Sequence, residues 1–193
     1  LFTTFIFFEI MSFASYVWVA QDEKEGSLRA GATYLAVAVI GGMVMLMGLF
    51  LLYSQTHTLV ISELFVACEH SQNPLLLFIS GCLILVGFGA KAGMFPLHIW
   101  LPKAHPVAPA PASALLSGIL TKTGVYGVIV ISMEMFRENA TWAYIILMIG
   151  VITMLLGAIL AVFSTNLKRT LACSSMSQIG FISVGIAMSI FLG

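Results

Sequence analysis

Six apolar stretches of about 20 residues divide this chain and limit what it can fold into. A helix that crosses the core of a bilayer needs about 20 mostly apolar residues. The stretches cover residues 1–20, 31–53, 75–101, 112–133, 142–164 and 171–192. We therefore predict an all-α polytopic membrane helix bundle with six transmembrane helices, forming one transmembrane domain over residues 1–193.

The composition supports this class of protein. Charged residues make up 8% of the chain, whereas soluble domains contain about 25%. This difference excludes an ordinary soluble domain, a disordered segment and a nucleic-acid-binding protein. Cys68, Cys82 and Cys173 form no CxxC pair, and the His and Glu residues between positions 57 and 70 match no regular ligand spacing, so no metal site is predicted.

Residues 1–20 do not resemble a secretory signal peptide, because Glu9 lies among them and no basic region precedes the apolar run. The last apolar stretch continues to the end of the sequence without a closing polar loop. We therefore expect the chain to be a piece of a longer polytopic protein.

The connections between the stretches differ in their basic residues. The first, third and fifth connections contain Lys24, Arg29, Lys103, Lys168 and Arg169. The second and fourth contain only Arg137. The positive-inside rule therefore places the odd-numbered connections on the cytoplasmic or matrix side. The second connection, residues 54–74, then lies on the opposite side, and its mixture of apolar and charged residues predicts a short interfacial helix.

The third stretch is too long and too interrupted to be a plain helix. It contains Gly89, Gly93 and Pro96, and a proline at this depth removes a backbone donor. Such a break persists in hydrocarbon only where neighbouring protein or a water-filled cavity satisfies the freed carbonyls. We expect a broken helix, of the kind that lines ion or substrate sites, with a GxxxG pair at Gly89 and Gly93 that lets another helix approach. A rigid proline-rich turn is expected at residues 102–111.

Three charged residues lie inside the stretches: Glu9, Lys91 and Lys122. Each costs about 2.5–3.5 kcal/mol at the centre of a membrane helix, and ionisable groups at this depth are usually functional. Lys91 lies eleven residues before the expected turn and Lys122 eleven residues after it, so a rise of about 1.5 Å per residue places both about 16 Å from one surface. Glu9 lies about 20 Å from the same side. We expect both amines to face one interior cavity.

Two structural interpretations compete with a functional one. Glu9 can pair with one lysine to hold helices together, but the second lysine then stays unpaired in a low dielectric, where a neutral amine costs less. A lysine near the midplane can also extend toward the interface, although its stem covers only part of that distance.

Two histidines extend the candidate set. His98 follows Lys91 by seven residues, or two helical turns, and His105 lies seven residues further along. Imidazole titrates near neutral pH and can relay a proton between water and a buried amine. The alternative for each is a hydrogen-bonded histidine with a structural role.

Four segments of the chain resemble one known family. Residues 89–105, GAKAGMFPLHIWLPKAH, and residues 118–126, GILTKTGVY, closely resemble the antiporter-like proton-channel subunits of respiratory complex I. Residues 167–181, LKRTLACSSMSQIGF, and residues 7–11, FFEIM, match two further signatures. The same family includes the large subunits of Mrp-type sodium/proton antiporters and the membrane arm of formate hydrogenlyase and related energy-converting hydrogenases.

The resemblance implies an inverted-repeat fold of which this chain covers about the fifth to the tenth helix. Glu9 then corresponds to the acidic residue of the fifth helix, Lys91 to the lysine of the broken seventh helix, and Lys122 to that of the eighth, which passes protons onward. Asn166 departs from the pattern, because many relatives have an aspartate there.

We therefore predict proton translocation by a relay of Glu9, Lys91, Lys122, His98 and His105, in a subunit without a cofactor or a redox centre. The first hypothesis is a membrane-arm subunit of a redox-driven complex, either an NADH:quinone oxidoreductase or a formate hydrogenlyase or hydrogenase. The alternative is a subunit of a multi-subunit antiporter that exchanges Na⁺ or K⁺ for protons, and the third is a structural membrane scaffold. The first two imply other membrane subunits as partners and an energy-conserving membrane, either a bacterial or archaeal cell inner membrane or a mitochondrial inner membrane.

Overall fold

The computed structural model describes residues 1–71 and 73–192, and all regular elements in these ranges are helical. The elements in chain order are α1 (Phe2–Ala20), α2 (Glu25–Thr56), α3 (Ile61–Glu69), α4 (Pro74–Ala92), the 3₁₀ helix η1 (Leu97–Trp100), α5 (Leu101–Val107), α6 (Ala110–Leu115), the π-helical segment η2 (Leu116–Leu120), α7 (Thr121–Met135), α8 (Ala140–Val162) and α9 (Leu167–Leu192). Six helical segments of the described chain are long and apolar enough to cross a membrane. The predicted all-α bundle with six spans is confirmed.

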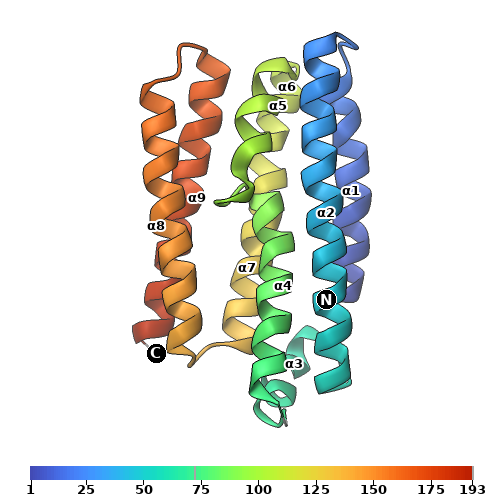
Figure 1. The fold of residues 1–193 in the computed structure, drawn as a ribbon, viewed down its shortest axis with the longest axis vertical. Coiled ribbons are helices and arrows are strands. Elements are labelled where there is room, and N and C mark those ends of the chain that lie inside the picture. The colour runs from blue at the N-terminus through green and yellow to red at the C-terminus, as the bar shows by residue number, and fades with distance from the viewer. Residues whose placement is uncertain (72, 193) are drawn as a thin grey trace.

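The spans alternate in direction. Figure 1 shows α1 and α2 on one side of the bundle, α8 and α9 on the other, and α4, α5 and α7 between them. The α1–α2, α5–α6 and α8–α9 connections lie at one end, and α3 and the α7–α8 connection lie at the other. The odd-numbered connections therefore share one end, as predicted, and α3 is a short helix within the second connection.

The second span begins earlier than predicted, at Glu25 rather than residue 31. Glu25 lies in the first turn of α2, and its carboxylate accepts a hydrogen bond from Arg29 at 2.5 Å. An acidic side chain at a helix N-terminus and an i,i+4 ion pair both favour a helical first turn. An apolar pattern detects only the part of a helix that lies in the membrane core, so it misses the polar first turn of α2.

The third span is broken, as predicted, at Gly93. This residue has a φ of 77°, in the left-handed region where glycine is favoured. The N–H groups of Gly93 and Met94 both donate to the Gly89 carbonyl at 2.9 Å, which closes the end of α4. Beyond the break, the indole of Trp100 donates to the Ala90 carbonyl at 2.7 Å. The Met94 N–H bonds to Gly89 instead of Ala90, so the indole, together with a longer bond from the Gly93 N–H at 3.3 Å, satisfies the Ala90 carbonyl.

The proline-rich turn expected at residues 102–111 is wrong. Pro102 lies in the first turn of α5, where its missing N–H costs nothing, and Pro106 lies inside the same helix. The chain turns only after Val107, where Ala108 is extended, with φ −68° and ψ 144°. The distance of Lys91 from the end of this span is therefore greater than the count from Pro102 indicated.

Helices α2 and α7 each approach α4 closely, but not at the expected GxxxG pair. A Cβ on Gly87 would crowd the backbone of α2, and a Cβ on Gly124 would crowd the backbone of α4. Within the described chain, a Cβ on Gly89 would meet only Met94 atoms of its own segment, at 3.8 Å. In the part of the chain that the structure describes, Gly89 is therefore not a point of close approach between helices.

Candidate functional site

The side chain of Lys91 lies buried between α1, α2 and α4. It is 2% exposed, and its Nζ donates hydrogen bonds to Ser12 Oγ at 2.6 Å and to Tyr34 Oη at 3.0 Å. Nζ also lies 5.2 Å from the ring centre of Phe8 and 5.4 Å from that of Tyr34. Every one of these neighbours is neutral, so the amine is held by dipoles and aromatic faces.

A hydroxyl network continues from Lys91. Ser15 Oγ and Tyr34 Oη are 2.5 Å apart, and either hydroxyl can donate. Ser12 donates to the Phe8 carbonyl at 2.9 Å. Lys91, Ser12, Ser15 and Tyr34, together called the amine cluster below, are all buried. The cluster can adapt to both states of the amine, because a charged amine donates to Tyr34 Oη, whereas a neutral amine accepts a hydrogen bond.

Sequence reasoning missed Ser12, Ser15 and Tyr34. A signal for two of them was present, because Ser12 and Ser15 follow Glu9 at intervals of three residues and so share one face of a helix. Tyr34 carries no comparable signal, because it lies in a run of apolar residues on α2.

Glu9 lies one turn from Ser12 on α1. Its Oε1 is buried and has no hydrogen-bond partner among the described residues. A Cβ on Gly42 would overlap this carboxylate, so the glycine leaves the space in which it lies. The described chain contains no Glu9–Lys91 contact within 4.0 Å. Glu9 therefore lies one helical turn from a residue of the amine cluster, and among the described residues it does not form the structural ion pair with Lys91 considered above.

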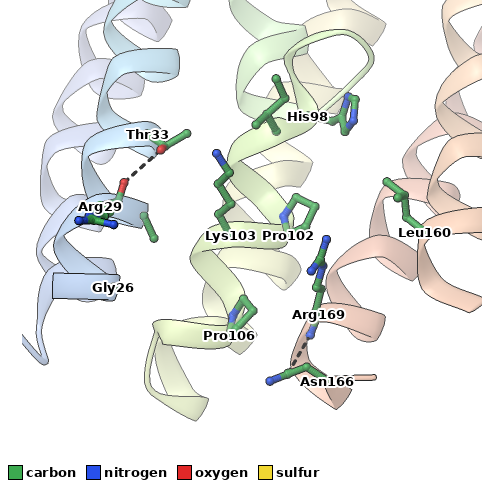
Figure 2. A pocket seen from close by; sticks show the side chains of 12 residues that line it. Gly26, Arg29, Thr33, His98, Pro102, Lys103, Pro106, Leu160, Asn166 and Arg169 are labelled. Carbon is green, nitrogen blue, oxygen red and sulfur yellow. Dashed lines mark hydrogen bonds between the residues drawn. The ribbon is translucent and has the colours of Figure 1, made fainter. Parts of the chain in front are cut away.

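His98 lies beyond the break, in η1. Its ring stacks on Phe95 with a centroid distance of 6.0 Å, and its Nδ1 is buried without a partner in the part of the chain that the structure describes. It lines an open cavity of about 710 Å³ at the end that carries the basic connections. Figure 2 shows this histidine above Pro102 and Lys103 of α5. An imidazole in this place can exchange protons with water in the cavity.

His105 lies in a second polar region. It is 2% exposed, its Nδ1 is 2.7 Å from Ser113 Oγ, and it lines a cavity of about 470 Å³ together with Lys168 and Ser175. Ser175 Oγ is in turn 2.6 Å from Ser117 Oγ on η2.

The structure brings Lys122 to this second region and not to Lys91. Its Nζ donates to the Ser117 carbonyl at 2.7 Å, and the side chain is exposed on the flank of α7 in this chain. The expectation that both amines face one interior cavity is therefore wrong for the described chain. The π-helical segment explains the geometry, because its wider turn carries the Ser117 carbonyl toward the side chain of the residue five positions later.

Asn166 directly precedes α9. Its Oδ1 accepts hydrogen bonds from the backbone N–H of Lys168 at 3.0 Å and of Arg169 at 3.3 Å. Asn and Asp are equally good helix N-cap residues. The asparagine therefore supplies the cap that an aspartate would supply, without its charge.

Comparison with known proteins is consistent with this geometry. Hydrogenase-4 component B of Escherichia coli is 35% identical over 188 residues, which are 95% of this chain and 28% of that protein. The NAD(P)H-quinone oxidoreductase chain 4 1 of Picosynechococcus sp. is 47% identical over 110 residues, which are 56% of this chain and 21% of that protein. A subunit in the structure of the Mrp complex from Dietzia sp. superimposes with a TM-score of 0.88 at 27% identity, covering 97% of this chain and 35% of that chain.

These relatives are several times longer than the chain, which spans about a third of their length or less. The family model described as "NADH:quinone oxidoreductase/Mrp antiporter, TM" matches residues 1–192. The match covers all six candidate spans and both polar regions. The chain is part of a multi-pass membrane protein and belongs to the NADH:quinone oxidoreductase/Mrp antiporter transmembrane family.

Proposed function

We propose that this chain conducts protons, as part of a membrane-arm subunit of a redox-driven complex of the NADH:quinone oxidoreductase or hydrogenase type. The observation that carries this proposal is the burial of Lys91 against neutral hydrogen-bond partners, with Glu9 Oε1, which has no hydrogen-bond partner among the described residues, on the next helical turn of α1. A structural ion pair would place the two in contact, whereas a relay needs an amine that can gain and lose its proton.

The hydrogen bonds of the amine cluster leave Lys91 able to transfer a proton. An ammonium has three donors, and Ser12 and Tyr34 occupy two of them, so the third stays available for transfer. A negative charge on Glu9 favours the ammonium, and neutralisation of Glu9 favours its release of a proton. His98 at the first cavity connects the cluster to water, and His105 and Lys122 form the onward part of the path.

The relay is tested in the full-length protein, assembled in its own complex and reconstituted in proteoliposomes. Lys91→Ala and Glu9→Gln are each expected to abolish most proton translocation and to leave assembly intact. Lys91→Arg also fails, because a guanidinium does not give up its proton. The control is Lys24→Gln, which removes an exposed lysine from the α1–α2 connection. Undiminished translocation by Lys91→Ala or Glu9→Gln at wild-type protein levels would refute the relay.

A second candidate function is supported by the likeness to the Mrp complex structure. As a subunit of a multi-subunit antiporter, the protein exchanges Na⁺ or K⁺ for protons through the same groups. Co-purification separates the two, because iron–sulfur or hydrogenase subunits accompany a redox-driven complex, whereas only further membrane subunits accompany an antiporter.

A further inference from the structure

Trp100 is a buried aromatic residue that packs against the amine cluster. It is the last residue of η1 and is 1% exposed. Its ring centre lies 4.9 Å from that of Tyr34, with an angle of 58° between the two rings. Tyr34 in turn accepts a hydrogen bond from Lys91 Nζ at 3.0 Å. The indole therefore contacts the ring whose hydroxyl binds the amine.

The N–H of the same indole binds the helix that carries Lys91. Trp100 Nε1 donates to the Ala90 carbonyl at 2.7 Å, and Ala90 directly precedes Lys91 on α4. The Ala90 carbonyl and the Lys91 nitrogen belong to one planar peptide group, so this hydrogen bond holds the peptide from which the lysine side chain starts. Trp100 thus contacts both partners of the Lys91–Tyr34 hydrogen bond, one through its N–H and the other through its ring.

This double contact matters because Lys91 lies in the last turn of a broken helix. Helix α4 ends at Ala92, and Gly93 follows with a φ of 77°. The last carbonyls of a helix have no partner in the next turn, so groups from outside the helix decide how firmly this turn is held. The indole of Trp100 is such a group, and it comes from the other side of the break.

A second buried tryptophan shows what packing alone requires. Buried tryptophans usually find a hydrogen-bond partner, and the indole of Trp142 on α8, which is fully buried, donates to Ser132 Oγ at 3.0 Å. Its ring stacks on Phe136 with a centroid distance of 4.2 Å. Trp142 therefore has the burial, the donor and the aromatic contact of Trp100, but neither of these partners belongs to the amine cluster.

We propose that Trp100 is a positioning residue of the proton relay, which sets the distance between Lys91 Nζ and the Tyr34 hydroxyl by holding the Ala90–Lys91 peptide and the Tyr34 ring together. This inference rests on the proposed function. Trp100 does not itself carry the proton, since its N–H is bound to the Ala90 carbonyl. Because η1 also contains His98, the indole links the helix at the first cavity to the amine cluster.

The test replaces Trp100 in the full-length protein, assembled in its complex and reconstituted in proteoliposomes. Trp100→Phe keeps a buried aromatic ring and removes the hydrogen bond to Ala90. Proton flux is expected to fall about tenfold or more, because a displacement of about 1 Å in a reacting group can cost about 100-fold. Trp142→Phe is the matched control, since it also removes a buried indole hydrogen bond, and it is expected to keep the flux of wild type.

An infrared measurement separates positioning from a general loss of stability. In protein that carries isotope-labelled tyrosine, the C–O stretch of Tyr34 is the band that Tyr34→Phe removes, and it reports the hydrogen bonds of that hydroxyl. The band is expected to shift in Trp100→Phe and to stay in place in Trp142→Phe. Trp100→Phe should also lower the flux less in a Tyr34→Phe background than in wild type, because residues that act through one contact are not additive.

The outcomes distinguish this inference from the relay on which it rests. Wild-type flux in Lys91→Ala would refute the relay, and the inference with it. Loss of flux in Lys91→Ala, with wild-type flux and an unshifted Tyr34 band in Trp100→Phe, would overturn the positioning role alone. Failure of Trp100→Phe to assemble where Trp142→Phe assembles, or losses of flux that multiply in the Trp100→Phe/Tyr34→Phe double variant, would make Trp100 a core residue and overturn that role as well.

Discussion

A Cβ atom at position 42 of α2 would overlap the carboxylate of Glu9 on α1, so Gly42 leaves the space in which that carboxylate lies. The clash involves only the end of a flexible side chain, because the atoms crowded by the added methyl group all belong to the Glu9 carboxylate. The backbones of the two helices can therefore keep their positions while the carboxylate moves.

Gly42→Ala is accordingly expected to preserve folding and assembly while lowering proton flux on the order of 10- to 100-fold, the range that follows a displacement of about 1 Å in a reacting group. Proton uptake by proteoliposomes measures the flux, and the elution volume of the complex reports assembly. Gly185→Ala is the control, because a Cβ there meets nothing within 4 Å. Wild-type flux in Gly42→Ala would show that the position of Glu9 does not matter.

The Tyr34 hydroxyl accepts a hydrogen bond from Lys91 at 3.0 Å, so Tyr34→Phe removes that hydrogen bond and leaves the ring in place. A hydrogen bond to a charged group contributes about 1.5–3 kcal/mol, and its loss makes the protonated amine less stable. Proton flux is expected to fall about tenfold or more, and thermal stability is expected to fall with the loss of this buried hydrogen bond. Tyr53→Phe is the matched control, because Tyr53 is exposed and contacts His57 through its ring.

Equal flux in both tyrosine variants would show that the Tyr34 hydroxyl is not needed for proton transfer.

The spans and the break could be predicted from the sequence because both depend on local properties. Apolar length determines whether a segment crosses a bilayer, and a glycine in the left-handed region ends a helix wherever the helix packs. The contact between Lys91 and Tyr34 depends instead on how α2 is rotated against α4. That rotation depends on the close approach of α2 to α4 at Gly87. An apolar pattern does not distinguish this glycine from the others in the same span.

The position of Lys122 shows the same limit. Counting residues from the turn assumed a regular helix, but the π-helical segment η2 and the continuation of the third span to Val107 change both the direction and the depth of the side chains. Neither feature has a signal in the composition. The four prolines favoured a turn, but Pro102 fits the first turn of a helix as well as it fits a turn, so the sequence could not separate the two.

Asn166 is expected to act as a helix cap without a charge-dependent role. Asn166→Ala removes the acceptor for the N–H groups of Lys168 and Arg169 and should cost about 1 kcal/mol of stability. Asn166→Asp should keep the stability of the wild type, since aspartate caps equally well. Thermal unfolding of the purified complex measures both. A large gain in proton flux in Asn166→Asp would contradict this assignment and show that a carboxylate at this position takes part in the path.

Lys122→Met tests the onward part of the relay. The substitution removes the amine that donates to the Ser117 carbonyl, but Thr121 Oγ1 also donates to that carbonyl, at 2.9 Å, so the π-helical segment keeps a partner. Stability should therefore stay close to wild type, while proton flux falls on the order of 100-fold, the contribution typical of a positioned proton donor. Electron transfer, where the assembled complex performs it, should fall less, so the ratio of protons moved to electrons transferred is the measurement. Lys24→Met serves as the control for loss of a lysine. A wild-type ratio in Lys122→Met would make this lysine a structural partner of Ser117, and protons would then have to leave the amine cluster through His98.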